Sequence, residues 1–293
     1  MRASERGEVT TRHCRRVRDA NMKRVSIKTW DEFVDKVEEL QAKRDSCQKQ
    51  RSLLVSELLY RGQPDSRMKL ETTLERSMQH EITLSNYYRF VSVIKAKIES
   101  VTGKVWDIPS LDQFGEWLDQ NERPPFVKFP AHDFFAYLRH HGLPSPLLDW
   151  TRSPYVAAHF AMFPTPRLGV KHVAVYVYLE SAGVKIGDVG APAIQSLGQY
   201  VTTHRRHYLQ QSEYTICTAG KGQLLRYASH EDVADRNARN QDLLWKLVIP
   251  VSEKRNFMEH LQRMNINPFS LFETEDSLMD DIYLSEIFLR KHL

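Results

Sequence analysis

The chain has 293 residues, of which 41% are hydrophobic and 27% are charged, and its net charge is +4. A chain of this length buries about three quarters of its unfolded surface without needing a disulfide or a metal, and this composition excludes collagen, coiled-coil rods and full-length disorder. No apolar run reaches the length of a transmembrane helix and the N-terminus has no apolar signal segment, so we expect a cytoplasmic protein with no membrane contact.

The basic residues gather at the N-terminus. Residues 1–28 contain nine Lys or Arg and three Asp or Glu, a net charge of +6, which leaves −2 for the rest of the chain. Because few of these residues are apolar, we expect a flexible arm. Such an arm contacts nucleic acid or an acidic partner through counterion release, or is a solvated tail with no specific role. The sequence therefore predicts an arm over 1–28 and one domain over 29–293.

The first half of the domain is predicted to be mostly helical. Thr29 and Glu32 have the spacing of a capping box, which indicates a first helix to about Asp45. A buried strand is expected over 53–60, with Arg61 emerging at its C-terminal end before the breakers Gly62 and Pro64. Four more helices are expected, over 77–101, 111–118, 131–140 and 155–163. Residues 141–153 are rich in Gly, Pro and Leu and are expected to form an apolar loop held against the core.

Strands are expected mainly in the second half. The β-rich runs lie at 172–179, 214–219 and 243–250, with a short extra strand at 223–227. A helix of small residues is expected over 191–200, and two helices close the chain, one capped by Ser252 and one over 276–291. The pattern lacks regular βαβ alternation. We therefore predict an α+β fold: a single domain with a helical N-terminal half and a mixed or antiparallel sheet.

Three polar clusters stand where regular elements meet loops, the places where rigid scaffolds display functional groups. They are Tyr60 to Gln63, His140 to Gly142 together with Asp149 to Ser153, and Gln210 to Glu213. The three cysteines are far apart, and no pair of histidines has the spacing of a zinc site, so no metal is expected. The chain also lacks the glycine-rich motifs of P-loop and Rossmann nucleotide sites.

Four segments carry a family resemblance: YRGQ (60–63), HHGLPSPLLDWTRSPYVAAHFA (140–161), RRHYLQQSEYT (205–215) and INPFSLFETEDSLMDDI (266–282). Together they closely resemble the FRG domain family, named for a Phe-Arg-Gly motif in which Tyr60 here replaces the Phe. The resemblance spans about Trp30 to Leu289 and implies one continuous domain. It implies no activity, because FRG domains were long described without one.

A second similarity concerns the order of the three clusters. Mono-ADP-ribosyltransferases of the Arg-Ser-Glu type have an Arg-Gly at the end of an early strand, a Ser-x-Ser-like element before a helix, and a Gln-x-Glu or Glu-x-Glu before a later strand. This chain is similar in having, in that order, Arg61 with Gly62, Thr151 with Ser153, and Gln211 with Glu213. The similarity implies a sheet resembling the split sheet of these transferases, NAD as substrate and no metal.

The same similarity implies a role for each residue. Glu213 would hold a ribose hydroxyl and stabilise the oxocarbenium-like centre that forms when the bond between ribose and nicotinamide breaks. Arg61 would grip a phosphate or ribose oxygen of the dinucleotide. Thr151 and Ser153 would orient Glu213 or the ribose, and Gln211 would face the acceptor. Three aromatic side chains are candidates to stack on nicotinamide: Tyr60, Trp150 and Tyr155.

Structural roles remain open for the same residues. Arg61 and Asp149 would also make an ion pair that braces two loops. The segment from Asp149 to Ser153 would also cap the helix that follows it. In the FRG pattern the position of Glu213 varies while a neighbouring glutamine recurs, which makes Gln210 the alternative third-cluster residue. His141 would serve instead as a ribose-binding residue or as a general acid or base.

The leading hypothesis is an NAD-consuming enzyme, an ADP-ribosyltransferase or NAD glycohydrolase, acting as a bacterial toxin or antiviral defence effector on an unidentified protein or nucleic-acid acceptor. An inhibitor or activator partner would accompany such a toxin. The alternative hypotheses are a non-catalytic nucleotide- or RNA-binding module, in which the basic arm adds phosphate contacts, and a nuclease that uses His141.

Overall fold

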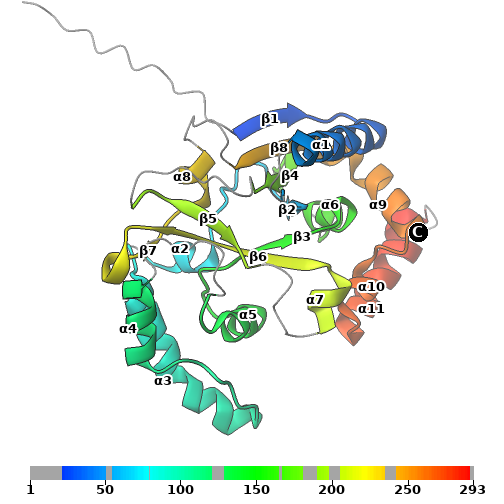
Figure 1. Cartoon of the computed structure of the whole chain (residues 1–293). Coiled ribbons are helices and arrows are strands. Elements are labelled where there is room, and N and C mark those ends of the chain that lie inside the picture. Colours follow the sequence, from blue (N-terminus) through cyan, green and yellow to red (C-terminus); the bar gives the residue numbers. More distant parts are fainter. Residues whose placement is uncertain are drawn as a thin grey trace, which may run out of the picture.

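Runs of β-branched and aromatic residues form the strands of one open mixed sheet (Figure 1). The computed structural model describes residues 22–50, 55–78, 80–120, 129–164, 167–180, 190–197, 205–234 and 242–290. Within these ranges the strands are β1 (Met22–Ser26), β2 (Leu58–Gln63), β3 (Leu148–Thr151), β4 (His172–Leu179), β5 (Ala193–Ser196), β6 (Ser212–Ala219), β7 (Arg226–Tyr227) and β8 (Leu243–Pro250). Their order is β1-β8-β4-β2-β3-β6-β5, and β7 pairs with the end of β6. The pairs are antiparallel except β1 with β8, which is parallel.

Helices surround this sheet. They are α1 (Trp30–Gln50), α2 (Thr73–Ser77), α3 (Leu84–Thr102), α4 (Leu111–Gln120), α5 (His132–His140), α6 (Pro154–Met162), α7 (Arg205–Leu209), α8 (His230–Ala234), α9 (Lys254–Arg263), α10 (Pro268–Phe272) and α11 (Glu275–Ile282). Short 3₁₀ turns lie at Gly222–Leu224 and Val251–Glu253, and a π-helical segment covers Tyr283–Leu289. The predicted α+β fold with a mixed sheet is confirmed.

The two faces of the sheet are covered unequally. Alternate residues of β4, such as Val175 and Val177, pack with α1, α6 and α9, and farther along the sheet Tyr214 packs with α3 to α5. The intervening residues, such as Tyr176, face the other side, where Leu70 and α8 help to cover them. This division follows from the pleat, which points successive side chains to opposite faces.

Helix α6 packs unusually close to β2, and Gly62 permits the approach. A Cβ atom at Gly62 would lie 2.1 Å from the backbone oxygen of Ala157 and 2.6 Å from the backbone nitrogen of Ala161. The small side chains of α6 allow the same approach from the helix side. Gly62 is therefore needed for packing, in addition to any role in a site.

Several strands differ from the sequence-based expectation. β2 continues through Arg61 and ends at Gln63, because Gly62 has neighbours on β4 that keep it in the ladder. β3 occupies the end of the expected loop over 141–153, and β5 replaces the expected helix over 191–200 in its described part. β1 lies inside the predicted arm, so order begins before Thr29; residues 1–21 of that arm lie outside the described residues.

Helix ends also differ in detail. The expected helix over 77–101 begins later than predicted: α3 starts after Thr83, whose side chain accepts a hydrogen bond from the backbone nitrogen of Asn86. Gly103 ends this helix in the left-handed conformation, as the sequence predicted. Thr29 caps α1 as expected, but Glu32 accepts from the backbone nitrogen of Lys28, which leaves the predicted capping box half formed.

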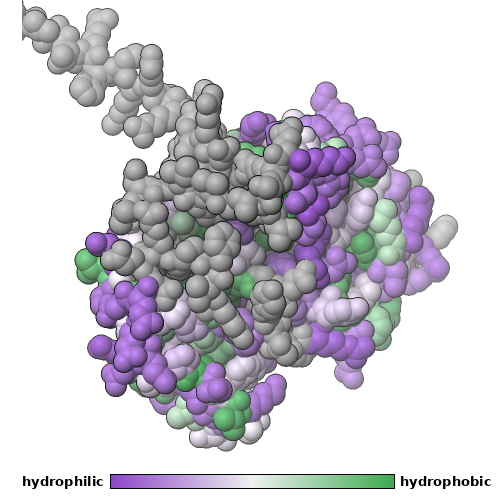
Figure 2. Space-filling view, viewed as in Figure 1, coloured by the Kyte–Doolittle hydropathy of each residue, from purple (hydrophilic) through white to green (hydrophobic). Residues whose placement is uncertain are grey.

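The solvent-facing side of α1 is hydrophilic (Figure 2). Its buried side places Trp30, Phe33 and Leu40 in the core beside α6 and α9. No helix in the described part of the chain is both long and apolar enough to span a bilayer.

Candidate functional site

The three polar clusters lie on three neighbouring strands at the centre of the sheet. The first is on β2, the second on β3 and the third at the start of β6. Tyr60 pairs with Thr151, and Trp150 pairs with Glu213. Segments about 150 residues apart in sequence are therefore brought together by strand pairing, although the sequence placed the second cluster on a loop.

The pleat divides these residues between the two faces of the sheet. Residues directly opposite in an antiparallel pair share a face. Tyr60 and Thr151 therefore lie on the face covered by α1 and α6, whereas Trp150 and Glu213 lie on the other face. The predicted site residues therefore do not all face one cleft.

A cavity of about 380 Å³ lies where the sheet splits. β3 pairs with β2 through only one residue pair and then ends at Thr151, so the first part of β2 and the start of β6 are left apart. The cavity between them contains one residue from each cluster, Tyr60, Arg152 and Gln211, and its other walls are Gln41, Glu57 and Leu58. This volume is at the lower end of the range for small-molecule sites.

Arg61 is held inside the protein by β3. Its Nη1 donates to the backbone oxygen of Asp149 at 2.7 Å and lies 3.9 Å from the Asp149 carboxylate. Arg139 of α5 binds the same carboxylate, with Nη2 2.5 Å from Oδ2. Burial alone would raise the pKa of Asp149, but Arg139 and Arg61 beside it hold that pKa below its ordinary value. The ion pair that the sequence offered as the structural alternative is therefore present, and Arg61 does not line the cavity.

The hydroxyls of the second cluster close the turn between β3 and α6. Ser153 caps α6 by accepting from the backbone nitrogen of Val156. Thr151 accepts from the backbone nitrogen of Ser153 and donates to the backbone oxygen of Gln210 at 2.7 Å. These contacts match the capping alternative and leave neither hydroxyl pointed at the cavity.

Glu213 is a buried carboxylate beside the cavity wall. It is 4% exposed, and its Oε2 has no hydrogen-bond partner among the described residues. Its Oε1 lies 3.8 Å from Nε of Arg152, which is an ion pair but not a hydrogen bond. Burial raises the pKa of Glu213, and Arg152 opposes that rise. Arg152 thus lines the cavity and is the ionic partner of Glu213, which is not itself a cavity wall.

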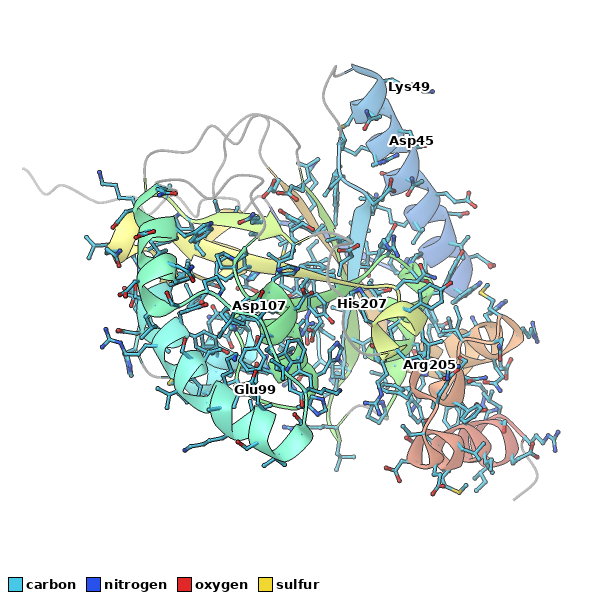
Figure 3. The ribbon with its side chains drawn as sticks, turned by 60° about the horizontal axis from the view of Figure 1, so that its bottom comes forward. Asp45, Lys49, Glu99, Asp107, Arg205 and His207 are labelled. Carbon is cyan, nitrogen blue, oxygen red and sulfur yellow. The ribbon has the colours of Figure 1, made fainter. Side chains whose placement is uncertain are left out.

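The remaining third-cluster residues fix the start of β6. Gln211 adopts a positive φ of 47°, and its backbone oxygen accepts from the backbone nitrogen of Arg152 at 3.0 Å. The side chain of Gln210 donates to the backbone oxygen of Leu271, so it points to α10 and not to the cavity. His207 lies on α7 (Figure 3). Its ring stacks on Tyr214, with the ring centroids 5.5 Å apart.

The predicted stacking candidates have different surroundings. Trp150 is buried, and its Nε1 donates to Thr215 on the face opposite Tyr60. Tyr155 stacks on Trp30 at 5.8 Å, and only Tyr60 lines the cavity. His141 lies at the end of α5 against Tyr137, away from the cavity walls.

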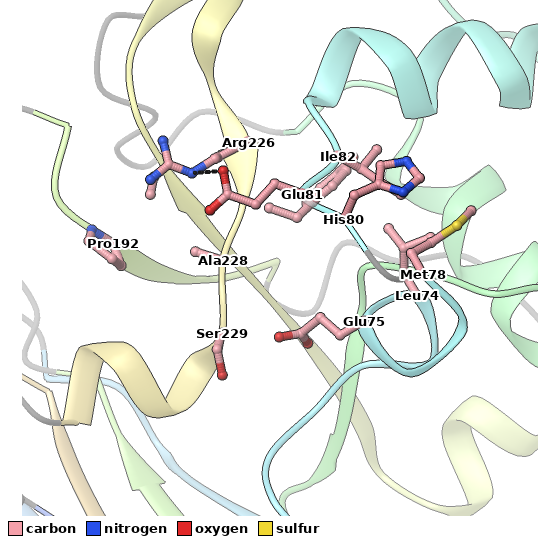
Figure 4. Close-up of a pocket in the computed structure, with 12 residues that line it drawn as sticks. Leu74, Glu75, Met78, His80, Glu81, Ile82, Pro192, Arg226, Ala228 and Ser229 are labelled. Atoms are coloured by element: carbon pink, nitrogen blue, oxygen red, sulfur yellow. Dashed lines mark ion pairs between the residues drawn. The ribbon is translucent and has the colours of Figure 1, made fainter.

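A second cavity, of about 310 Å³, lies at the other end of β6 (Figure 4). Its walls come from α2, the segment before α3, and β7, and an ion pair between Arg226 and Glu81 crosses it at 3.1 Å. It contains no residue that the sequence singled out. The described residues hold no group of three His, Cys, Asp or Glu that could bind a metal ion.

Two residues at this site were missed by the sequence reasoning. Arg152 lies in the second cluster, between Thr151 and Ser153. The signal that could have identified it is a basic residue within a cluster of candidate site residues. Gln41 reaches the cavity from α1 and had no local signal, because only the tertiary fold brings that helix to the sheet split.

Residues 56–166 match the family model of the FRG domain. This match supports the FRG resemblance, covering β2, β3 and the helices between them. It ends before β4, so Gln210, Gln211 and Glu213 lie outside it. No curated protein and no solved structure matched the chain.

Proposed function

We propose that this protein consumes NAD by cleaving the bond between nicotinamide and ribose, as an ADP-ribosyltransferase or an NAD glycohydrolase. One observation carries the proposal: a cavity at the sheet split contains one side chain from each of the three clusters and adjoins a buried carboxylate. The support comes from these residues and their order in the chain, since the family match concerns the FRG domain alone.

Glu213 is the proposed catalytic carboxylate. When the glycosidic bond breaks, its electron pair leaves with nicotinamide and positive charge develops at C1′ of the ribose. A carboxylate in a site shielded from water stabilises that charge strongly. Water or an acceptor nucleophile then forms the new bond to C1′ and releases a proton. Because Arg152 is the ionic partner of Glu213, the proposal requires the Arg152 side chain to turn away so that the substrate takes its place beside the carboxylate.

The cavity walls supply the other proposed contacts. Tyr60 offers its ring to nicotinamide, and Gln211 at the mouth of the split faces the acceptor. Arg61 acts as a brace through Asp149, in place of the phosphate contact that the sequence assigned to it. Thr151 and Ser153 hold the turn that presents Arg152. The acceptor is a protein or nucleic acid, and a role as a toxin or antiviral effector remains part of the proposal.

Release of nicotinamide tests the function. Purified full-length protein is incubated with NAD, with and without candidate protein and RNA acceptors, and free nicotinamide is quantified by chromatography. We expect release by the wild type and a loss of at least about 100-fold in Glu213→Gln, the scale of losing a transition-state electrostatic group. Glu39→Gln is the matched control, since Glu39 is exposed, pairs with Lys36 and does not line the cavity. NAD that stays intact under all conditions would overturn the proposal.

A further inference from the structure

We infer that the cavity at the sheet split takes the ribose 5-phosphate unit of a nucleotide, with Arg152 as its phosphate-binding residue. The inference narrows the substrate class of the proposed function and rests on it. Neither the sequence patterns nor the family match assigns a role to Arg152, and the phosphate contact had been expected from Arg61.

Arg61 and Arg152 differ in their partners and in their exposure. Arg61 already donates to the backbone of Asp149 and shares that carboxylate with Arg139, and its side chain is 14% exposed. Arg152 has a side chain that is 39% exposed and lines the cavity. Its guanidinium makes no hydrogen bond with any residue that the structure describes. Nε of Arg61 has no partner among the described residues, but Arg61 does not line the cavity, so of the two only Arg152 can donate to an anion there.

The charged groups around the cavity also bear on phosphate binding. Glu57 would repel a phosphate, but Arg44 neutralises it, with Nη2 2.5 Å from Oε1. Glu213 is 3.8 Å from Arg152 and would compete with a phosphate for it. The amides of Gln41 and Gln211 add neutral donors to the walls. A planar guanidinium with flanking amide donors suits a phosphate monoester.

Glu213 would need a new partner when Arg152 binds a phosphate. The carboxylate then loses its ionic partner and is left with a buried Oε2 that has no hydrogen-bond partner in the described part of the chain. Ribose hydroxyls are donors that satisfy such an oxygen. A ligand with both a phosphate and a ribose therefore replaces both halves of the Arg152–Glu213 contact. Phosphate alone would replace only the partner of Arg152, and ribose alone only the partner of Glu213. The site should therefore bind ribose 5-phosphate more tightly than either ribose or phosphate.

The size of the cavity agrees with this assignment. About 380 Å³ is at the small end of ligand sites and suits a mononucleotide-sized group. The adenosine half of NAD would lie outside the cavity and contribute less to recognition. Nicotinamide mononucleotide is then expected to be a substrate as well as NAD.

Isothermal titration calorimetry on the full chain tests the inference with ribose 5-phosphate, ribose and inorganic phosphate as separate probes. We expect ribose 5-phosphate to bind at least tenfold more tightly than either of the other two. Arg152→Gln should weaken it at least tenfold, and Arg152→Lys should restore part of the loss. Arg67→Gln is the matched control, because Arg67 is exposed, pairs with Asp65 and does not line the cavity. Thermal unfolding of each variant checks that it is folded.

The outcomes separate the inference from the proposed function. If the wild type does not bind ribose 5-phosphate, or Arg152→Gln binds it as well as the wild type, the inference is wrong. If ribose 5-phosphate binds through Arg152 while NAD is never cleaved, the binding site stands and the enzymatic proposal fails. If the wild type and Arg152→Gln cleave NAD equally, the proposed activity is supported and the proposed phosphate contact of Arg152 is wrong.

Discussion

The guanidinium groups of Arg139 and Arg61 both approach Oδ2 of Asp149, at 2.5 Å and 3.9 Å, so α5 and β2 are joined through a single residue of β3. Nε of Arg139 also donates to Asp149 at 3.0 Å, and its Nη1 donates to Thr73 of α2. This contact fixes the segment from which β3 delivers Arg152 to the cavity.

Replacing Arg139 should therefore destabilise the fold. Arg139→Gln leaves Asp149 with only Arg61 as its cationic partner. We expect the free energy of unfolding to fall by about 2 kcal/mol, less than for a fully buried pair because the Asp149 side chain is 38% exposed. Urea denaturation measures the change. Arg67→Gln, which removes an exposed pair, should leave the free energy of unfolding nearly unchanged, and equal losses in the two variants would contradict this account.

Gly62→Ala tests the close approach of α6 to β2. The added methyl would collide with backbone atoms of Ala157 and Ala161, which cannot yield as a side chain would. We expect a loss of about 3 kcal/mol in unfolding free energy, or failure to fold. Gly115→Ala in α4 is the control: its nearest neighbour is 3.7 Å away, and helix propensity favours Ala by about 0.5–1 kcal/mol. Similar stability in both variants would show that α6 lies farther from β2.

The buried side chain of His159 should make the folded protein less stable in acid. It is fully buried on α6, neither ring nitrogen has a partner among the described residues, and burial lowers its pKa from 6.5 to about 4. Between pH 6.5 and pH 4, His159 is protonated in the unfolded state but stays neutral in the folded state. Stability is therefore lost as the pH falls from 6.5 toward 4, at up to about 1.4 kcal/mol per pH unit.

Denaturation of His159→Leu at pH 7, 6 and 5 measures this contribution. The variant should lose less stability on acidification than the wild type. His172→Leu, which removes an exposed histidine, should follow the wild-type slope. A His159→Leu slope equal to that of the wild type would show that His159 is protonated in the folded protein.

Arg152 should control the pH dependence of catalysis. Burial raises the pKa of Glu213, and Arg152 is the cation that opposes the rise. Removing it in Arg152→Gln raises this pKa further, so the acid limb of the nicotinamide-release profile should move to higher pH. Arg152→Lys should move it back. An unchanged limb in Arg152→Gln would mean that Glu213 is not the group whose ionisation limits the reaction.

The sequence predicted the elements that have strong periodicity or strong caps. β4 and β8 are continuous apolar runs, and α6 starts at Pro154, so their positions were correct. It missed β3 because four residues flanked by Gly and Pro carry no strand signal, and this strand forms only because β2 and β6 pair with both of its edges. The expected helix over 191–200 failed for a similar reason, since β5 depends on pairing with β6.

The sequence indicated three segments that meet in the sheet, but not which side chains line the cavity: Tyr60 and Gln211 were among the predicted residues, whereas Arg152 and Gln41 were not. Residue order placed the three clusters together, and strand pairing does bring them together. The face on which each side chain lies depends on register, which the sequence did not define. Arg61 and Arg152 look equivalent in sequence, and only the Asp149 contact and the cavity distinguish them.

The most direct test of the central claim is a crystal structure of Glu213→Gln soaked with NAD. We predict ribose and phosphate density in the cavity at the sheet split, with the phosphate on Arg152 and nicotinamide beside Tyr60. NAD bound in the second cavity beside Arg226, or no density at saturating NAD, would contradict the account.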